Sequence, residues 1–161
     1  MTLLLGDLIP LPDIEARELE MLRAVEEAML ALAPGTAARD LQGRYPHKAI
    51  SVLAETGVFK TGLVGEKESG TPPYSQRFSL EAQLRIAAVD SSIAQIFKVH
   101  DELLREMTEY GSTAQIDRLR SLVFEEQAVI GLAVAEAGRT AAESMQTLCR
   151  RVDDDTFELN G

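Results

Sequence analysis

The sequence has few of the residues that cross-link a chain or bind metals. It contains one cysteine, two histidines and no tryptophan in 161 residues. Cys149 has no partner for an internal disulfide, which agrees with a reducing, cytoplasmic location. His47 and His100 lie far apart in the sequence with no cysteine near them, so we predict no metal site. A phosphate-binding loop, a dinucleotide-binding glycine motif and a serine nucleophile motif are also absent.

Positive charge is scarce as well. The chain has 16 Lys and Arg against 26 Asp and Glu, a formal net charge of −10. Such a balance repels phosphate backbones, so we predict no nucleic-acid partner. Residues 1–12 carry no basic residue and are interrupted by Asp7 and two prolines. We therefore predict neither a signal peptide nor a membrane span in this segment.

What is present is an ordinary globular composition, 45% hydrophobic and 26% charged. Apolar residues recur at helical spacing through most of the first 126 residues. They predict about five helices, whose first residues or caps are Asp13, Pro46, Ser79, Asp90 and Ser112. Gly111 is expected to end the fourth helix in a left-handed conformation, and residues 60–78 form a long connection.

The pattern changes to a period of two near residues 125–128. Two strands are predicted, Thr147 to Val152 and Thr156 to Leu159, joined by a turn at Asp153 to Asp155. The predicted fold class is mainly α, a helical bundle in residues 1–126 followed by an incomplete antiparallel β segment in residues 127–161. A strand pair alone leaves its faces and edges uncovered, so we expect the chain to be an excerpt of a longer protein or one half of a two-chain assembly.

Several short segments resemble, in order, the N-terminal helical domain and first strands of the acyl-CoA dehydrogenase superfamily. The segment Phe157 to Gly161 is similar to the family's "Y-x-L-N-G" hairpin, and Ile93 to Ile96 with Val99-His100 are similar to its desulfurisation-type flavin monooxygenases. The remaining matches are Tyr45-Pro46-His47, Ala49-Ile50, Leu53 to Gly57, Asp90 to Ala94, Gly111-Ser112 with Gln115 and Arg118, and Ala133 to Gly138.

The resemblance implies a flavin-dependent oxidoreductase with a helical domain, a middle β-barrel and a C-terminal four-helix bundle. It implies FAD or FMN as cofactor, and acyl-CoA or another small molecule as substrate. The expected partners are further copies of the chain, or a chain that supplies the rest of the barrel and the C-terminal helices. The family's usual catalytic base lies in the C-terminal helices, so no residue of this sequence is assigned that role, and the chain alone is expected to be inactive.

The resemblance also implies flavin-contacting positions. In relatives, a strand reading "T-E-P-G-A-G-S-D" orients the flavin through backbone groups and hydroxyls. The matching residues here run from Ala135 to Ala142, and of the motif only Glu136 and Gly138 are kept. Alanine stands at both hydroxyl positions, Ala135 and Ala141, while backbone groups of Leu132, Val134 and Ala135 would still contact the flavin. Relatives of the monooxygenase type also carry an amide where this chain has Leu132. These departures favour an alternative, a non-catalytic helical scaffold or interaction subunit that has lost flavin binding.

His100 has two interpretations. It matches a histidine that the monooxygenase relatives place near the flavin, where a neutral imidazole would stabilise a peroxide. It also lies on the apolar face of its predicted helix, where a histidine with one hydrogen bond would be part of the core. The sequence favours the second interpretation.

Overall fold

The structure, a computed structural model, describes residues 13–63, 73–133 and 146–161. Contacts divide the chain after Gly131 into a helical unit, Met1–Gly131, and a strand unit, Leu132–Gly161. The sequence placed this boundary at residue 126. The predicted fold class, mainly helical with a short antiparallel sheet, is confirmed.

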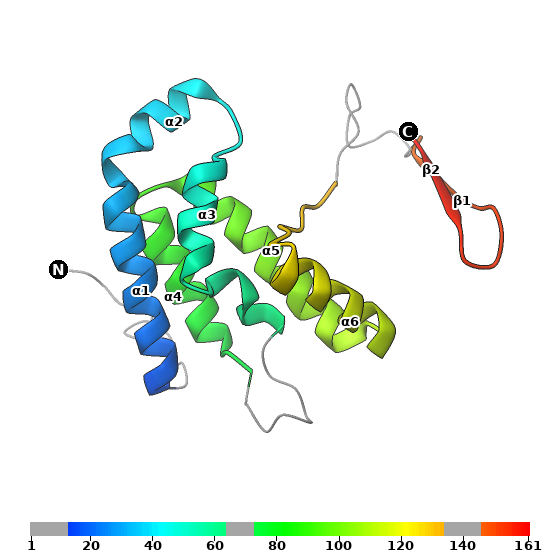
Figure 1. Cartoon of the computed structure of the whole chain (residues 1–161), viewed down its shortest axis with the longest axis horizontal. Helices are drawn as coiled ribbons and strands as arrows, with labels where there is room; N and C mark the ends of the chain where they lie inside the picture. Colours follow the sequence, from blue (N-terminus) through cyan, green and yellow to red (C-terminus); the bar gives the residue numbers. More distant parts are fainter. Residues whose placement is uncertain (1–12, 64–72, 134–145) are drawn as a thin grey trace. The chain divides into compact units, whose positions relative to one another are not determined.

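The described part of the helical unit contains six α-helices and three short helical turns (Figure 1). The α-helices are α1 (Ala16–Leu32), α2 (Thr36–Gln42), α3 (His47–Glu55), α4 (Gln76–Ala87), α5 (Ser91–Tyr110) and α6 (Thr113–Arg120). Two turns are 3₁₀-helical, η2 (Ala33–Gly35) and η3 (Val58–Leu63), and η4 (Ser121–Glu125) is π-helical.

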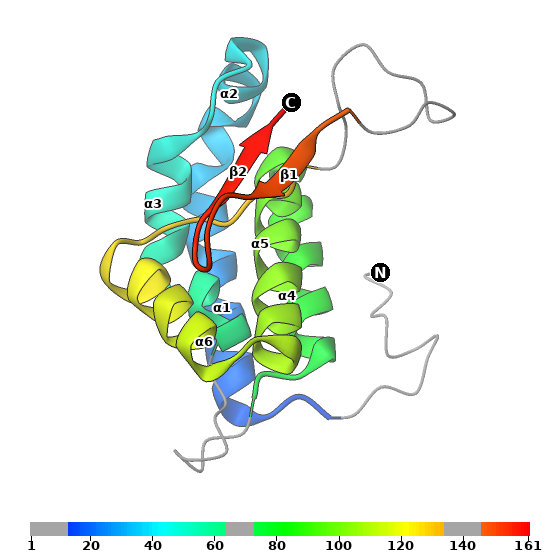
Figure 2. The ribbon, with the colours of Figure 1, turned by 90° about the vertical axis from the view of Figure 1, so that its right-hand side faces the viewer.

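Helix α4 contacts both α1 and α5, and η3 packs against α5 (Figures 1 and 2). The main core fills the space among these elements. Its fully buried residues lie one helical turn apart, as in Leu22, Val25 and Met29 of α1, because that spacing places side chains on one face. A smaller cluster of Leu63, Leu104 and Val123 joins η3, α5 and η4.

The predicted helix starts are correct for three helices and wrong for two. Asp90 caps α5 by accepting from the N–H groups of Ser92 and Ile93, and Ser112 forms a capping box with Gln115. Helix α1 begins after Glu15 rather than at Asp13, because Glu15 and Glu18 form a capping box. Helix α4 begins after Ser75, whose Oγ accepts from the Phe78 N–H, so the expected cap, Ser79, lies buried within the helix.

Two further differences concern helix α2 and Gly111. Helix α2 was not predicted, because its apolar residues form no stripe along one face, and in the structure none of its residues is buried. Gly111 follows α5 in an extended conformation with φ −72°, so the predicted left-handed stop is wrong. A Cβ at Gly111 would overlap the Met107 carbonyl oxygen, and this close approach explains the glycine.

The described strand unit contains a hairpin of β1 (Leu148–Arg151) and β2 (Phe157–Asn160), in which Arg150 pairs with Glu158. The Asp153 carboxylate accepts from the N–H groups of Asp155 and Thr156 at 3.0 and 2.8 Å, which closes the turn as predicted. The Asp155 N–H is the main cause of the lowered pKa of Asp153. Every residue of both strands is exposed.

Candidate functional site

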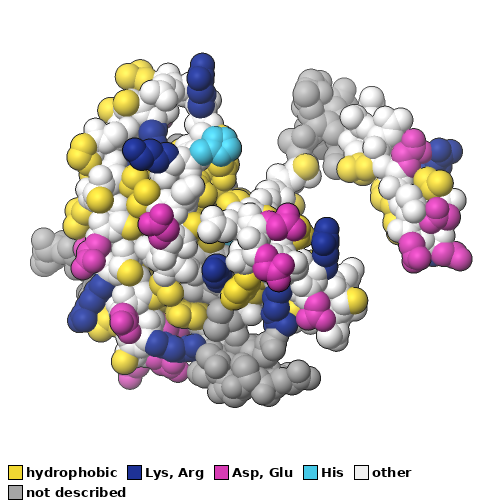
Figure 3. Space-filling model, in the orientation of Figure 1, with side chains coloured by type: hydrophobic (Ala, Val, Ile, Leu, Met, Phe, Trp, Pro, Cys, Tyr) yellow, Lys and Arg dark blue, Asp and Glu magenta, His cyan; other side chains and the backbone are white. Residues whose placement is uncertain are grey.

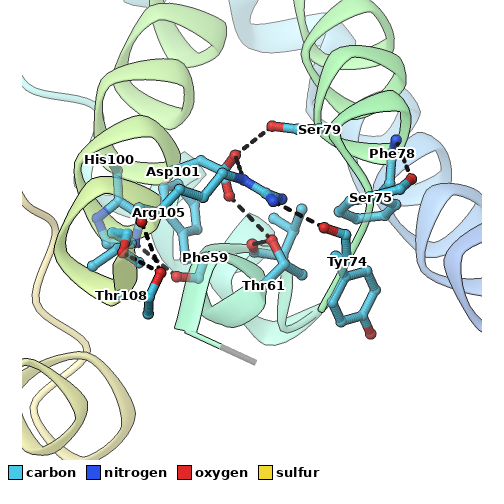
Figure 4. Close-up of polar contacts among 12 residues, drawn as sticks. Phe59, Thr61, Tyr74, Ser75, Phe78, Ser79, His100, Asp101, Arg105 and Thr108 are labelled. Atoms are coloured by element: carbon cyan, nitrogen blue, oxygen red, sulfur yellow. Dashed lines mark hydrogen bonds and ion pairs between the residues drawn. The ribbon is translucent and has the colours of Figure 1, made fainter. Parts of the chain in front are cut away.

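His100 lies inside the helical unit on α5 and has no exposed surface. Its Nε2 lies 2.7 Å from the Phe59 carbonyl oxygen (Figure 4). Its Nδ1 accepts from the Ile130 N–H at 3.0 Å. Since a carbonyl only accepts and an amide N–H only donates, the ring is the neutral tautomer with its proton on Nε2. The Phe59 ring also meets the imidazole edge to face, with centroids 5.2 Å apart.

The electrostatic setting of His100 agrees with a neutral ring. Burial lowers the pKa of His100, and this effect outweighs the Phe59 carbonyl and the Asp101 carboxylate, which both raise it. Both ring nitrogens form hydrogen bonds within the chain. In this arrangement neither nitrogen is open to donate a proton to a bound cofactor.

The next residue, Asp101, is the centre of a buried polar network (Figure 4). Its Oδ2 accepts hydrogen bonds from Ser79 Oγ on α4 and from Arg105 Nε one turn along α5, the latter at 2.8 Å. Its Oδ1 lies 3.4 Å from Thr61 Oγ1 on η3. One carboxylate thus joins α4, α5 and η3, and its charge is balanced by a guanidinium, as a buried charge requires.

Three charged side chains hold the backbone that enters α4. Arg17 Nη2 donates to the Pro73 carbonyl at 3.2 Å, and Arg105 Nη1 donates to the Tyr74 carbonyl at 2.9 Å. Glu18 Oε1 accepts from the Ser75 N–H at 2.5 Å. Three consecutive residues are therefore fixed by α1 and α5.

A groove runs over the surface between α4 and α5. At one end a hollow of about 340 Å³ has many polar and charged lining residues, among them Ser79, Arg105 and Glu106. At the other end a hollow of about 320 Å³ is lined mainly by Leu80, Leu84 and small residues. Leu80, Gln83 and Lys98 border both. The Arg105 Nη2 atom is buried without a hydrogen-bond partner among the described residues.

Asp90, part of the family-like segment, has a structural role. Its Oδ1 caps α5, while its Oδ2 accepts from Arg39 Nε at 3.0 Å. Arg39 also donates to the Leu32 carbonyl and to Thr36 Oγ1. The pair therefore ties α2 and the end of α1 to the start of α5.

The expected flavin positions are only partly covered. Val134, Ala135 and Ala141 lie outside the described residues. Leu132 belongs to the strand unit, its side chain is 58% exposed, and no described residue hydrogen-bonds its backbone. Its N–H and C=O are thus open for the backbone contacts that a flavin ring would need. The described residues do not bring Leu132 and His100 together in one unit.

Other candidate sites can be checked over residues 13–63, 73–133 and 146–161. Within them, no three His, Cys, Asp or Glu side chains gather closely enough to hold a metal ion, and no helix combines the length and apolar character of a membrane span. Cys149 is exposed and unbridged. Acidic and basic side chains are interspersed over the face of the helical unit seen in Figure 3, without a patch of one sign.

The Asp101 network was not predicted from the sequence. The signal was present in part, since Asp101 and Arg105 stand one turn apart on a helix and flank the apolar Leu104. Ser79 was taken for a helix cap, and nothing in the sequence links Thr61 to α5.

No protein-family model matches the chain, and its comparison with curated proteins and with solved structures also gives no match.

Proposed function

We propose that this chain is the N-terminal helical part, with the first strands, of a flavin-dependent oxidoreductase of the acyl-CoA dehydrogenase superfamily. The substrate would be an acyl-CoA thioester or another small molecule, and the cofactor FAD or FMN. One observation carries the proposal: four of the family-like segments lie at the start of a helix or form a strand. Pro46-His47 starts α3, Asp90 caps α5, Ser112 and Gln115 cap α6, and Phe157 to Asn160 form β2.

The hairpin supports the same proposal. Leu148, Phe157 and Leu159 are each at least 60% exposed, and a two-stranded hairpin without a packed face is marginal in water. A further surface is therefore needed to cover these side chains. In the proposed enzyme it comes from the remainder of a β-barrel, supplied by a complementary chain or by another copy.

In the proposed enzyme, the helical unit is a scaffold and Leu132 lies at the cofactor. When bound, a flavin would supply hydride acceptance or oxygen activation. The backbone N–H and C=O of Leu132 would orient it. His100 would hold no proton for the reaction, since both of its nitrogens bond to backbone groups.

The second candidate is a non-catalytic helical scaffold that does not bind flavin. The occupied nitrogens of His100 favour it, and so do the alanines at positions 135 and 141, which lack the hydroxyls of relatives. In this case the exposed hairpin would serve association alone.

Flavin titration distinguishes the two candidates. FAD and FMN are added separately to the purified chain, and binding is followed by the visible absorption and fluorescence of the flavin. Binding that is lost in Leu132→Pro, which removes the N–H donor, and retained in Leu132→Ala supports the oxidoreductase. Absence of binding by a chain with an intact helical circular dichroism spectrum supports the scaffold.

A further inference from the structure

The segment that leaves the helical unit is held by packing and by a hydrogen bond to one side chain of α5. This connector, residues 128–131, follows η4 and leads to the strand unit. Its Ile130 N–H donates to His100 Nδ1 at 3.0 Å. The side chains of Val129 and Ile130 pack on the main and the smaller core cluster, respectively.

The start of the connector is strained. Gln127 has φ 54°, a left-handed conformation that is unfavourable for a residue other than glycine. The turn is closed by a hydrogen bond of 3.0 Å from the Ala128 N–H to the Leu122 carbonyl. Among the described residues, one other hydrogen bond joins the connector to the helices, from the Ile130 N–H to His100 Nδ1.

We propose that His100 is a proton-operated latch, which holds the connector on the helical unit when the ring is neutral and releases it when Nδ1 is protonated. Nδ1 serves Ile130 as an acceptor only while it lacks a proton. A proton there turns the acceptor into a second donor that faces the Ile130 N–H. Nε2 keeps its bond to Phe59, so the ring stays on η3 while the connector is freed.

The charged groups near the ring do not replace the lost bond. On α5, Asp101 is already engaged by Ser79 and Arg105. On η3, the Lys60 ammonium lies over the Phe124 ring, 5.1 Å from its centroid. On η4, Glu125 accepts from Ser121, and the connector itself carries no charged residue. Protonation of His100 therefore acts directly on the Ile130 bond.

The latch can respond to acid while the rest of the helical unit stays folded. The core residues Phe97 and Leu22 have no exposed surface and belong to a large apolar cluster, so their packing does not depend on the charge of His100 alone. The connector is held by fewer contacts and opens first. The freedom of the connection to the strand unit would thus depend on pH, whether or not a flavin binds.

Amide exchange and imidazole titration test the latch in the ¹⁵N-labelled full chain. The imidazole nitrogen shifts give the tautomer and protonation of His100, and the exchange protection factor of the Ile130 amide is measured from about pH 7.5 to about pH 5. We expect Ile130 protection to fall by about tenfold or more as His100 titrates, since one hydrogen bond is lost. The protection of the Phe97 amide should remain.

Two variants complete the test. In His100→Gln, an amide side chain accepts from Ile130 and donates to Phe59 without titrating, so Ile130 protection should no longer depend on pH. His47→Gln alters the second, exposed histidine and should retain the fall. The latch is overturned by constant Ile130 protection while His100 titrates, by a parallel loss at Phe97, or by a ring that stays neutral until the unit unfolds. If His100→Gln does not fold, the wild-type chain still tests the latch, because Ile130 protection and His100 protonation are both measured in it across the same pH range.

Discussion

Glu18 on α1 accepts a hydrogen bond of 2.5 Å at Oε1 from the backbone N–H of Ser75, the residue that caps α4. Its Oε2 accepts from the Glu15 N–H at 3.1 Å, at the start of α1. The side chain is 1% exposed. One buried carboxylate therefore satisfies donors at the starts of two helices, and the positive ends of both helix dipoles favour its charge.

Glu18→Gln should lower the free energy of unfolding by about 1–3 kcal/mol, because the amide NH₂ would face a backbone donor and leave it unsatisfied. Urea denaturation followed by far-UV circular dichroism measures this change. The matched control is Glu20→Gln, on the exposed side of α1, with an expected change within about 0.5 kcal/mol. Equal effects of the two variants would contradict the assigned role of Glu18.

The Asp101 network gives a second prediction. Asp101→Asn removes the charge that balances Arg105, and the expected loss of stability is about 2–4 kcal/mol. Glu102→Gln breaks an exposed ion pair with Lys98 on the same helix, which should cost less than about 1 kcal/mol. In a double-mutant cycle with Ser79→Ala, the two effects should not add, since both residues share one hydrogen bond. Additive effects would mean that the bond does not contribute.

Gly62 permits the close approach of η3 to α5. A Cβ at this position would lie 2.8 Å from Leu104 Cβ and 3.2 Å from the Asp101 carbonyl oxygen. Gly62→Ala should therefore destabilise the helical unit by about 1–3 kcal/mol through overpacking. Gly131→Ala is the control, because no atom lies within 4 Å of a Cβ there. If the two variants give the same denaturation curve, η3 can move away from α5 without loss of stability, which would contradict this role of Gly62.

The helical part of the fold could be predicted because its signals are local. Apolar spacing and caps such as Asp90 and Ser112 depend on residues within one or two turns. Helix α2 was not predicted because it has no apolar face. It is held through Arg39, whose partner Asp90 is 51 residues away.

The candidate site depends on contacts that no local pattern contains. The apolar stripe of α5 predicted a buried His100, but its partners are backbone groups 41 and 30 residues away. Backbone partners leave no residue-type signature in the sequence. The same holds for Glu18 and Arg105, which bind the backbone of Ser75 and Tyr74 and whose side chains read as solvent-facing charges in the sequence.

The buried ring of His100 predicts a pH dependence of stability. Burial lowers the pKa of His100 in the folded chain below the ordinary value of about 6.5 that it regains on unfolding. Between these two pKa values the unfolded chain binds more protons than the folded chain, so stability must fall as pH decreases below about 6.5. One such group produces a slope of at most about 1.4 kcal/mol per pH unit. Urea denaturation at a series of pH values measures the slope, which His100→Gln should reduce by that amount and His47→Gln should leave in place. A slope that is the same in the wild type and in His100→Gln would show that the buried imidazole gains no proton on unfolding, contrary to its two backbone hydrogen bonds.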